Sequence, residues 1–213
     1  MYILKNIYLL SDTKKLGVTN VPTIQIKFFD KYIDIKNFDN LIFTSKNGVR
    51  ALDKVCKNWK DIPAISIGKK TADEVCKIGG FNIFTSKKGY GNHLVNDILT
   101  NFSDKAILYI RPEIVASNLT QMLLENNINI QEKILYKTEC RELSYNFENP
   151  IFIVTSPSTV KCLLNIEIPK SSIFIAIGKT TFQEIPKKYL KYISKYRNID
   201  SCIFLAKNLE LTK

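Results

Sequence analysis

The sequence predicts an α/β protein with two domains, each built on a parallel β-sheet, and three observations support this prediction. The first is a plan that occurs twice, in residues 41–75 and 151–185: an apolar run ends in Thr-Ser, a helix-like stretch follows, and a second apolar run ends in Ile-Gly-Lys with a threonine close behind. The second is the register, since Ser156 follows Ser45 by 111 positions and the glycine of the second copy follows that of the first by 110. The third is that the runs LIFTS and IFIVTS are continuous and β-branched, which is typical of central strands buried on both faces of a parallel sheet.

The amino-terminal part predicts two strands with little between them. Residues 2–10 form one apolar run and are expected to be the first strand. Residues 11–21 predict a short connection instead of a full helix, because their apolar residues show no helical period long enough. Residues 23–29, TIQIKFF, alternate apolar and polar positions as a half-exposed strand does. The polar residues 30–40 then lead into the first copy.

The first copy and the residues behind it alternate between strand and helix patterns. The helix after Ser45 is amphipathic, and the helix after Gly68 is expected to stop at the Gly79-Gly80 pair. The patterns beyond it predict a short strand at 81–85, a helix at 93–99, a buried strand at 105–110 and an amphipathic helix at 115–124.

Residues 132–138, EKILYKT, predict another short strand, which mirrors the extended segment near the amino terminus. If the two segments pair, they form a connector that the chain crosses twice, so that domain one is discontinuous. The second copy follows, then a Lys/Tyr-rich stretch at 189–196 and a last helix near 199–208. The expected boundaries are residues 1–23 plus 139–213 for domain one, residues 31–131 for domain two, and residues 24–30 and 132–138 for the two linker strands.

The composition fits a basic globular protein. Its 213 residues are 45% apolar, which is enough for a core in each of two domains. The formal net charge is +11, from 31 Lys and Arg against 20 Asp and Glu, so the field around the protein attracts polyanions. Nucleic acid, a membrane surface and a polycarboxylate all fit this charge. The basic residues are scattered and mostly Lys, beside many Asn and Ile, so a biased genome composition explains the charge equally well.

The five cysteines are far apart and show no Cys-x-x-Cys spacing, so we expect neither a disulfide framework nor a metal site, but reduced core residues. The apolar start, MYILKNIYLL, is too short to span a bilayer and lacks a small-residue cleavage site behind it. We therefore expect a cytoplasmic protein with no membrane partner.

Both copies place polar groups where ligands bind in open α/β sheets. Ser45 and Ser156 stand between the carboxyl end of a strand and the amino end of a helix, where unpaired backbone N–H groups favour anions. The two Gly-Lys segments repeat the arrangement one strand further on. Ser and Thr are also common N-caps, so ordinary helix capping is the alternative interpretation. Arg111, at the end of a strand, has two interpretations as well: a bidentate grip on a carboxylate, or an ion pair with Glu113.

The usual catalytic groups are scarce in this sequence. His93 is the only histidine, and no Gly-x-Gly-x-x-Gly segment, Walker loop, Gly-x-Ser-x-Gly segment or suitably spaced carboxylate pair occurs. The sequence therefore lacks the residues that usually carry out hydride transfer, phosphoryl transfer, metal-assisted hydrolysis or Ser-His chemistry. A reaction on this chain must depend mainly on holding a reactive substrate.

Six segments between about residue 39 and residue 185 resemble, in their order, the motifs of the uroporphyrinogen-III synthase (HemD) family. They are IFTSKNGV, SIGKKTADEV, LYIRPE, ILYKT, IVTSPSTV and AIGKTTFQEI. The resemblance implies two flavodoxin-like parallel-sheet domains joined by a two-stranded β linker, with the active site between the domains. The sequence departs from the family pattern in lacking a full helix between its first strand and the linker.

The resemblance also implies an activity. Linear hydroxymethylbilane, a polycarboxylate with eight carboxylates, would lose its hydroxyl as water and close with inversion of the last pyrrole ring to give uroporphyrinogen III. Such an enzyme is a hydro-lyase of haem biosynthesis, needs no cofactor or metal, and acts as a monomer without nucleic acid.

Tyr136 is the proton donor that the resemblance implies. Three features of the residues agree with this role: Tyr136 lies on the returning connector, it alternates with Ile134, and no histidine or carboxylate pair competes. The resemblance further implies these substrate-binding residues: Thr44, Ser45, Gly68, Lys69, Thr71, Arg111, Ser156, Ser158, Gly178, Lys179, Thr180 and Thr181.

The alternative function is a non-enzymatic protein, either a two-domain binder of an anionic metabolite or a basic nucleic-acid-binding module. A nucleic-acid binder concentrates Lys and Arg on one face among exposed aromatic residues. Here Phe43, Phe152 and Phe174 fall inside predicted buried strands, which disfavours that class.

Overall fold

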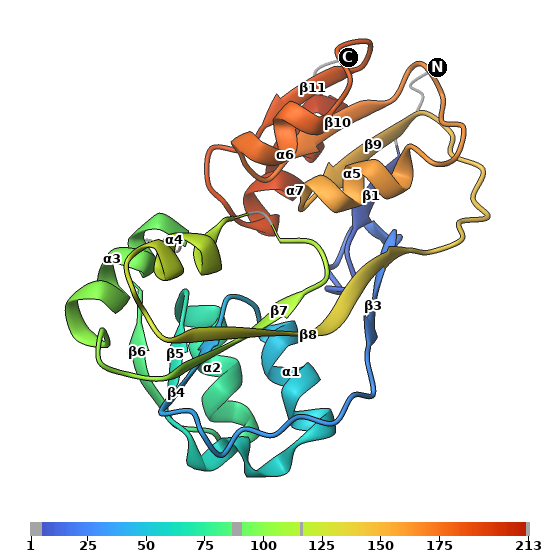
Figure 1. The fold of residues 1–213 in the computed structure, drawn as a ribbon. Helices are drawn as coiled ribbons and strands as arrows, with labels where there is room; N and C mark the ends of the chain where they lie inside the picture. Colours follow the sequence, from blue (N-terminus) through green and yellow to red (C-terminus); the bar gives the residue numbers. More distant parts are fainter. Residues whose placement is uncertain (1–5, 87–90, 116, 212–213) are drawn as a thin grey trace. The chain divides into compact units, whose positions relative to one another are not determined.

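The computed structural model describes residues 6–86, 91–115 and 117–211, and the chain divides into two compact units (Figure 1). Unit 1 contains Met1–Gln25 and Glu139–Lys213, and unit 2 contains Ile26–Thr138. Unit 1 is thus made from both ends of the chain, and unit 2 is inserted between them. No helix in the described ranges is long and apolar enough to cross a membrane.

Unit 1 is a parallel five-stranded sheet with helices on both faces. The strand order is β11-β10-β9-β1-β2, and every pair in it is parallel. The strands are β1 (Asn6–Leu10), β2 (Thr19–Asn20), β9 (Pro150–Val154), β10 (Ile173–Ala176) and β11 (Leu190–Ile193). The helices are α5 (Pro157–Leu163), α6 (Lys179–Glu184) and α7 (Ile199–Leu211). The second-copy run IFIVTS forms β9, which is fully buried in the middle of the sheet, so the prediction of a central strand is confirmed.

The alternation of side chains along these strands builds two core layers. On one face Phe152 and Phe174 pack with Val160 of α5, and on the other Ile153 and Ile175 pack with α7. The segment 11–21 forms the short strand β2 and no helix, as its sequence predicts. Residues 2–5 of the predicted first strand lie outside the described residues.

Unit 2 is a six-stranded sheet in the order β3-β8-β7-β4-β5-β6. The strands are β3 (Ile24–Phe28), β4 (Asn40–Phe43), β5 (Ala64–Ser66), β6 (Asn82–Thr85), β7 (Ile107–Pro112) and β8 (Ile130–Cys140). The helices are α1 (Lys46–Val55), the 3-10 helix η1 (Lys57–Asp61), α2 (Lys69–Ile78), α3 (Gly91–Asn101) and α4 (Leu119–Glu125). Residues of α1 and α2 pack in the core layer on one face, and those of α3 and α4 in the layer on the other. The first-copy run LIFTS supplies β4, which is completely buried inside the sheet as predicted.

The two expected linker strands correspond to β3 and β8, which are neighbours at one edge of this sheet. The Phe29 N–H donates to the Leu135 carbonyl at 2.8 Å and the Arg141 N–H donates to the Thr23 carbonyl at 2.9 Å. From Thr23 to Phe29 the residue number rises, while that of the bonded partner falls from Arg141 to Leu135, so the two strands are antiparallel. β8 is also paired in parallel with β7, so one long strand serves both the unit 2 sheet and the connector.

Two glycines shape the end of α2. Gly79 adopts a left-handed conformation with φ of 93° and ends the helix, as the Gly79-Gly80 pair predicts. Gly80 packs against the fully buried Trp59, because a Cβ atom at this position would lie 2.3 Å from the indole ring. Helix α4 begins at Leu119, later than the predicted start at 115, because β7 continues to Pro112 before the chain turns.

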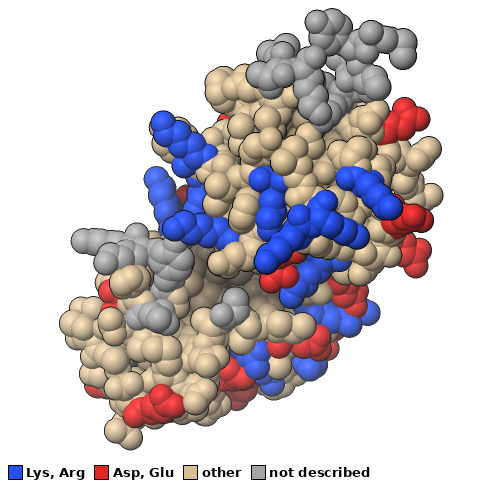
Figure 2. All heavy atoms as spheres, turned by 90° about the horizontal axis from the view of Figure 1, so that it is seen from above, with Lys and Arg blue, Asp and Glu red and all other residues tan. Residues whose placement is uncertain are grey.

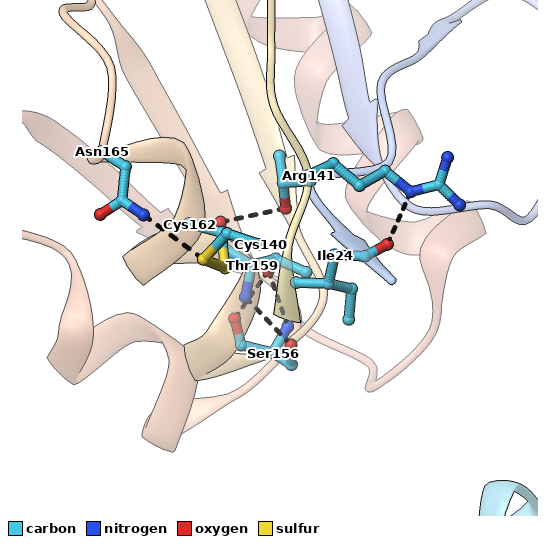
Figure 3. The surroundings of a disulfide bond; sticks show 8 residues. Ile24, Cys140, Arg141, Ser156, Thr159, Cys162 and Asn165 are labelled. Atoms are coloured by element: carbon cyan, nitrogen blue, oxygen red, sulfur yellow. Dashed lines mark hydrogen bonds between the residues drawn. A yellow bond between two sulfur atoms is a disulfide. The ribbon is translucent and has the colours of Figure 1, made fainter. Parts of the chain in front are cut away.

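The expectation of five reduced core cysteines is wrong for two of them, which are not reduced, and for Cys76, which is not in the core. Cys140 at the end of β8 and Cys162 in α5 form a disulfide, with Cα atoms 5.1 Å apart (Figure 3). They meet because the chain leaves β8 and then runs through β9 into α5 within 22 residues, an arrangement that cysteine spacing does not reveal. Of the free cysteines, Cys202 is buried, whereas Cys76 is exposed.

Candidate active site

The junction between β4 and α1 lies at the carboxyl edge of the unit 2 sheet. Ser45 is the N-cap of α1: its backbone is extended, and its Oγ accepts a hydrogen bond from the Asn47 N–H at 3.1 Å. This contact satisfies one of the N–H groups left unpaired at a helix start. The capping role foreseen as the alternative for Ser45 is therefore present.

Tyr136 reaches the same junction from β8. Its side chain is only 3% exposed and packs in the core layer that also holds Val49 of α1. Burial raises the pKa of Tyr136 to about 12, and the opposing effect of the Ser45 side chain on this pKa is smaller. The phenol therefore keeps its proton at neutral pH, as a proton donor requires.

A second buried phenol, Tyr109, approaches the junction from β7. Its hydroxyl lies 3.0 Å from the Thr44 hydroxyl, and its side chain is also only 3% exposed. Burial raises the pKa of Tyr109 as well, with the Thr44 hydrogen bond acting in the opposite direction. Thr44 thus binds the Tyr109 hydroxyl, while the next residue, Ser45, influences the pKa of Tyr136.

Arg111 is held by other groups of unit 2. Its Nη1 donates to the carbonyls of Pro112 at 2.9 Å and Glu113 at 3.1 Å, and its Nη2 donates to Glu132 Oε1 at 2.7 Å. Glu132 Oε2 also accepts from the Thr120 hydroxyl at 2.7 Å. Burial raises the pKa of Glu132, but the hydrogen bonds from Arg111 and Thr120 outweigh burial and hold this pKa below its usual value. The ion-pair partner of Arg111 is therefore Glu132, because the parallel pairing of β7 with β8 brings these side chains together, while Glu113 contributes its carbonyl.

A cavity of about 160 Å³ opens beside these groups. Its polar lining includes Tyr109, Arg111, Asn118, Thr120, Gln121 and Glu132. The Nε of Arg111 is buried and has no hydrogen-bond partner among the described residues. The cavity is thus lined by the side chains of Arg111 and Tyr109, and Tyr109 also contacts Thr44 at the junction.

The start of α2 lies beside the start of α1, because β4 and β5 are paired in parallel. Gly68 is the N-cap with an extended backbone, and no atom lies within 4 Å of where its Cβ would be. Lys69 is exposed, whereas Thr71 is 5% exposed and packs beneath the first turn. Two helix starts of unit 2 thus present backbone N–H groups at one sheet edge.

Unit 1 repeats these helix starts with different details. Ser156 and Thr159 form a capping box, in which each side chain accepts a hydrogen bond from the other residue's N–H, at 3.3 and 3.2 Å (Figure 3). Gly178 is the N-cap of α6, and a Cβ atom on it would lie 3.3 Å from Arg197 Nε. Ser158 is half-buried in α5. In the first turn of α6, Lys179 and Thr180 are exposed and Thr181 is 2% exposed.

The predicted site residues therefore fall into two sets, one at the sheet edge of each unit. In unit 2 the structure joins Thr44 directly to Tyr109, and Ser45 influences the pKa of Tyr136. In unit 1 it places the Ser156 and Gly178 junctions on the neighbouring strands β9 and β10.

Sequence reasoning missed Tyr109, Thr120 and Glu132. Tyr109 had a detectable signal, because it stands two residues before Arg111 in a strand and so shares its face. Glu132 and Thr120 had none, since their contact with Arg111 depends on the register of β7 with β8 and on the position of α4.

The surface agrees with an anionic ligand. The net charge is +11, and Figure 2 shows Lys and Arg side chains close to one another over part of the surface in view. Such a surface raises the local concentration of a polycarboxylate.

The sequence also matches a family model. Residues 13–203 match the model described as uroporphyrinogen-III synthase HemD, which is most of the chain. The chain belongs to the uroporphyrinogen-III synthase family. The resemblance carried by the six sequence segments is thereby confirmed.

Solved uroporphyrinogen-III synthases have the same fold. The enzyme from Helicobacter pylori 26695 matches over 96% of this chain and 99% of its own, with 24% identity and a TM-score of 0.83. A mutant enzyme from the extremely thermophilic bacterium Thermus thermophilus matches over 98% of this chain and 100% of its own, with 13% identity and a TM-score of 0.60. These likenesses confirm the predicted architecture of two α/β domains with parallel sheets. Among curated proteins, none matches the chain.

Proposed function

We propose that this chain is a uroporphyrinogen-III synthase, a hydro-lyase that converts hydroxymethylbilane into uroporphyrinogen III. The family match over residues 13–203 supports the reaction. The observation that supports a mechanism is the Tyr136 phenol, which is buried in unit 2 and whose pKa is raised to about 12, so that it is protonated at neutral pH. Tyr136 is the proton donor in this proposal.

The proposed reaction requires one proton transfer from the protein. The Tyr136 hydroxyl gives its proton to the departing hydroxyl of the substrate, the C–O bond breaks with its electron pair, and water leaves while the pyrrole nitrogen supplies electrons. The substituted carbon of the last ring then attacks to give a spiro intermediate, which reopens and closes with that ring inverted. The ring proton lost at the end restores the phenol, so the proton balance closes. One positioned donor contributes about 10²–10⁴-fold to such a step.

Holding the substrate is the larger task, because unaided closure occurs without inversion. We assign the substrate carboxylates to the helix starts of the two units. Lys69, Lys179 and Thr180 are exposed there, so their side chains and the backbone N–H groups beside them can meet a carboxylate. Thr71 and Thr181 are almost fully buried under the same turns, so they take part only where the substrate approaches closely.

The alternative of a nucleic-acid-binding module has weaker support. Phe43, Phe152 and Phe174 are completely buried, so they offer no platform on which bases could stack. A non-enzymatic binder of an anionic metabolite would use the same helix starts, and only an activity measurement separates it from the enzyme.

The test is to supply freshly made hydroxymethylbilane and to separate the product isomers. The proposal predicts the type III isomer, in an amount that rises with enzyme concentration. Type I alone, at the rate of the enzyme-free control, would refute the proposed activity.

A further inference from the structure

We propose that Cys140 and Cys162 are a redox-controlled pair. Their disulfide links the end of strand β8 to helix α5, and a dithiol that reduces it loosens α5 and the segment between β8 and β9. Neither cysteine lies in the six segments that carry the family resemblance. The expected effect on activity rests on the proposed function, whereas the effect on α5 does not.

The disulfide fixes the start of an irregular segment. Cys140 is the last residue of β8, and Cys162 lies in the last turn of α5, 22 residues further along the chain. The segment 141–149 belongs to no helix or strand, and its residues are mostly exposed, although Phe147 is buried. Because few buried contacts hold this segment, we expect it to open first when the disulfide is broken.

Weaker contacts join the same strand end to α5. The Arg141 N–H donates to the Thr23 carbonyl at 2.9 Å, and the Thr23 hydroxyl donates to the Thr159 carbonyl in α5 at 3.3 Å. Beyond α5, the Asn165 Nδ2 donates to the Cys140 Sγ at 3.4 Å (Figure 3). A distance of 3.3 Å is long for a hydroxyl donor, and sulfur is a weak acceptor. The covalent bond is therefore stronger than these contacts, and its loss should loosen the helix.

The two cysteines differ in their access to solvent. Cys140 is exposed, whereas Cys162 is only 5% exposed. A thiolate of the dithiol therefore attacks the Cys140 sulfur, which forms a mixed disulfide and releases Cys162 as a thiolate that takes up a proton. The second thiolate of the reagent then attacks the reagent's own sulfur in the mixed disulfide, and the Cys140 thiolate leaves and is protonated. The dithiol gives up two electrons and becomes a cyclic disulfide, and the reverse exchange closes the protein disulfide again.

Both ends of the disulfide belong to elements that carry proposed site residues. Helix α5 begins after Ser156, whose capping box with Thr159 lies about one turn before Cys162. Tyr136, the proposed proton donor, lies in the same strand as Cys140. Because α5 has only 7 residues, its turns do not form independently, and loosening the last turn should weaken the first. Reduction should therefore place the substrate less precisely.

The first test counts thiols and needs no substrate. Protein treated with oxidised dithiothreitol, and a sample then reduced in the native state by dithiothreitol, are each freed of reagent, unfolded in guanidinium chloride, alkylated with iodoacetamide and analysed by mass spectrometry. In the oxidised sample we expect the label on Cys56, Cys76 and Cys202 alone, and in the reduced sample on all five cysteines. Label on all five in the oxidised sample, or on the same three after native reduction, would overturn the proposal.

Hydrogen exchange and thermal unfolding then compare the oxidised and reduced forms. Backbone amides of residues 157–163 should exchange about tenfold faster in the reduced form, and the Tm should fall by about 5–10 °C. Cys140→Ser should match the reduced form under both conditions. Cys76→Ser, which removes an exposed free thiol in α2, is the matched control and should respond to dithiothreitol as the wild type does. Equal exchange of 157–163 in the two wild-type forms overturns the proposal, and this comparison stands even where Cys140→Ser does not fold.

The last measurement is activity with hydroxymethylbilane. We expect kcat/KM to be about 3- to 10-fold lower in the reduced form and in Cys140→Ser, because a loosened α5 positions the substrate less well. Oxidised dithiothreitol should restore the wild type but not the variant. Equal kcat/KM in the two wild-type forms would refute the effect on the site. If neither form makes uroporphyrinogen III, the proposed function fails, while the exchange measurement still decides whether the disulfide controls α5.

Discussion

Replacing Tyr136 by Phe removes one O–H group and keeps the aromatic ring in its core layer. If Tyr136 is the proton donor, kcat should fall by about one to three orders of magnitude, at about 1.4 kcal/mol for each. The change in stability should be small, about 1 kcal/mol, because the ring packing remains. The Ser45 Oγ keeps its hydrogen bond from the Asn47 N–H, so no buried acceptor is left without a donor.

The assay follows product isomers as the enzyme is diluted. Hydroxymethylbilane that is not processed in time closes by itself, so type I should accumulate beside type III in the variant at enzyme concentrations where the wild type gives type III alone. Thermal unfolding of both proteins is the control for folding. A Tyr136→Phe variant with the wild-type rate and pure type III product would refute the assignment and would leave a bound water or a substrate carboxylate as the donor.

The contribution of Tyr136 to the stability of the fold should decrease at alkaline pH. The pKa of Tyr136 is raised by burial from 10.0 to about 12, so the folded protein binds the phenol proton more tightly than the unfolded chain does. The resulting stabilisation is complete below about pH 10 and is lost as the pH rises toward 12. Urea unfolding at increasing alkaline pH should therefore show a steeper loss of stability in the wild type than in Tyr136→Phe.

Three further predictions concern charge, binding and packing. Because exposed charges are screened once the Debye length falls to about 8 Å, kcat/KM should decrease as KCl is added, and a flat profile would exclude long-range steering. Thr181→Val should lower kcat/KM by a factor that corresponds to about 1–3 kcal/mol if its hydroxyl serves a buried substrate carboxylate, whereas normal turnover with a lower Tm would assign Thr181 to packing beneath α6 alone, since Gly178 is the N-cap of this helix. Gly80→Ala should destabilise the protein by about 1–3 kcal/mol, since its Cβ would lie 2.3 Å from the fully buried Trp59. Gly68→Ala, with no atom within 4 Å, should lower the Tm less, by the small cost of alanine at an N-cap, and equal Tm values for the two variants would contradict the packing argument.

Periodicity and local chemistry predicted the elements whose signals lie in neighbouring residues. The continuous runs that became β4 and β9 indicated central strands because only strands buried on both faces tolerate apolar residues at every position. Gly79 indicated the end of α2 because glycine adopts the left-handed conformation at low cost. The duplicated plan located the helix starts in both units without any structural information.

Contacts between distant residues could not be predicted in this way. The Glu132 partner of Arg111 depends on the register of two strands, and the bond between Cys140 and Cys162 depends on where the chain returns from β8. The hydrogen bond between Tyr109 and Thr44 is of the same kind, since it joins β7 to the junction that follows β4. The sequence named Thr44 as a candidate, but only the sheet order brings Tyr109 to it.

The insertion of unit 2 into unit 1 has a consequence for the order of folding. During synthesis the residues of unit 2 are complete once Thr138 has emerged, whereas the sheet of unit 1 still lacks β9, β10 and β11. Unit 2 can therefore fold before unit 1, because β1 cannot pair with β9 until the last third of the chain has been made. The entry and exit of the insertion lie next to each other, because the Arg141 N–H donates to the Thr23 carbonyl at 2.9 Å. A folded unit 2 thus holds its two ends together, which shortens the effective loop between β1 and β9 and lowers the entropic cost of pairing these strands.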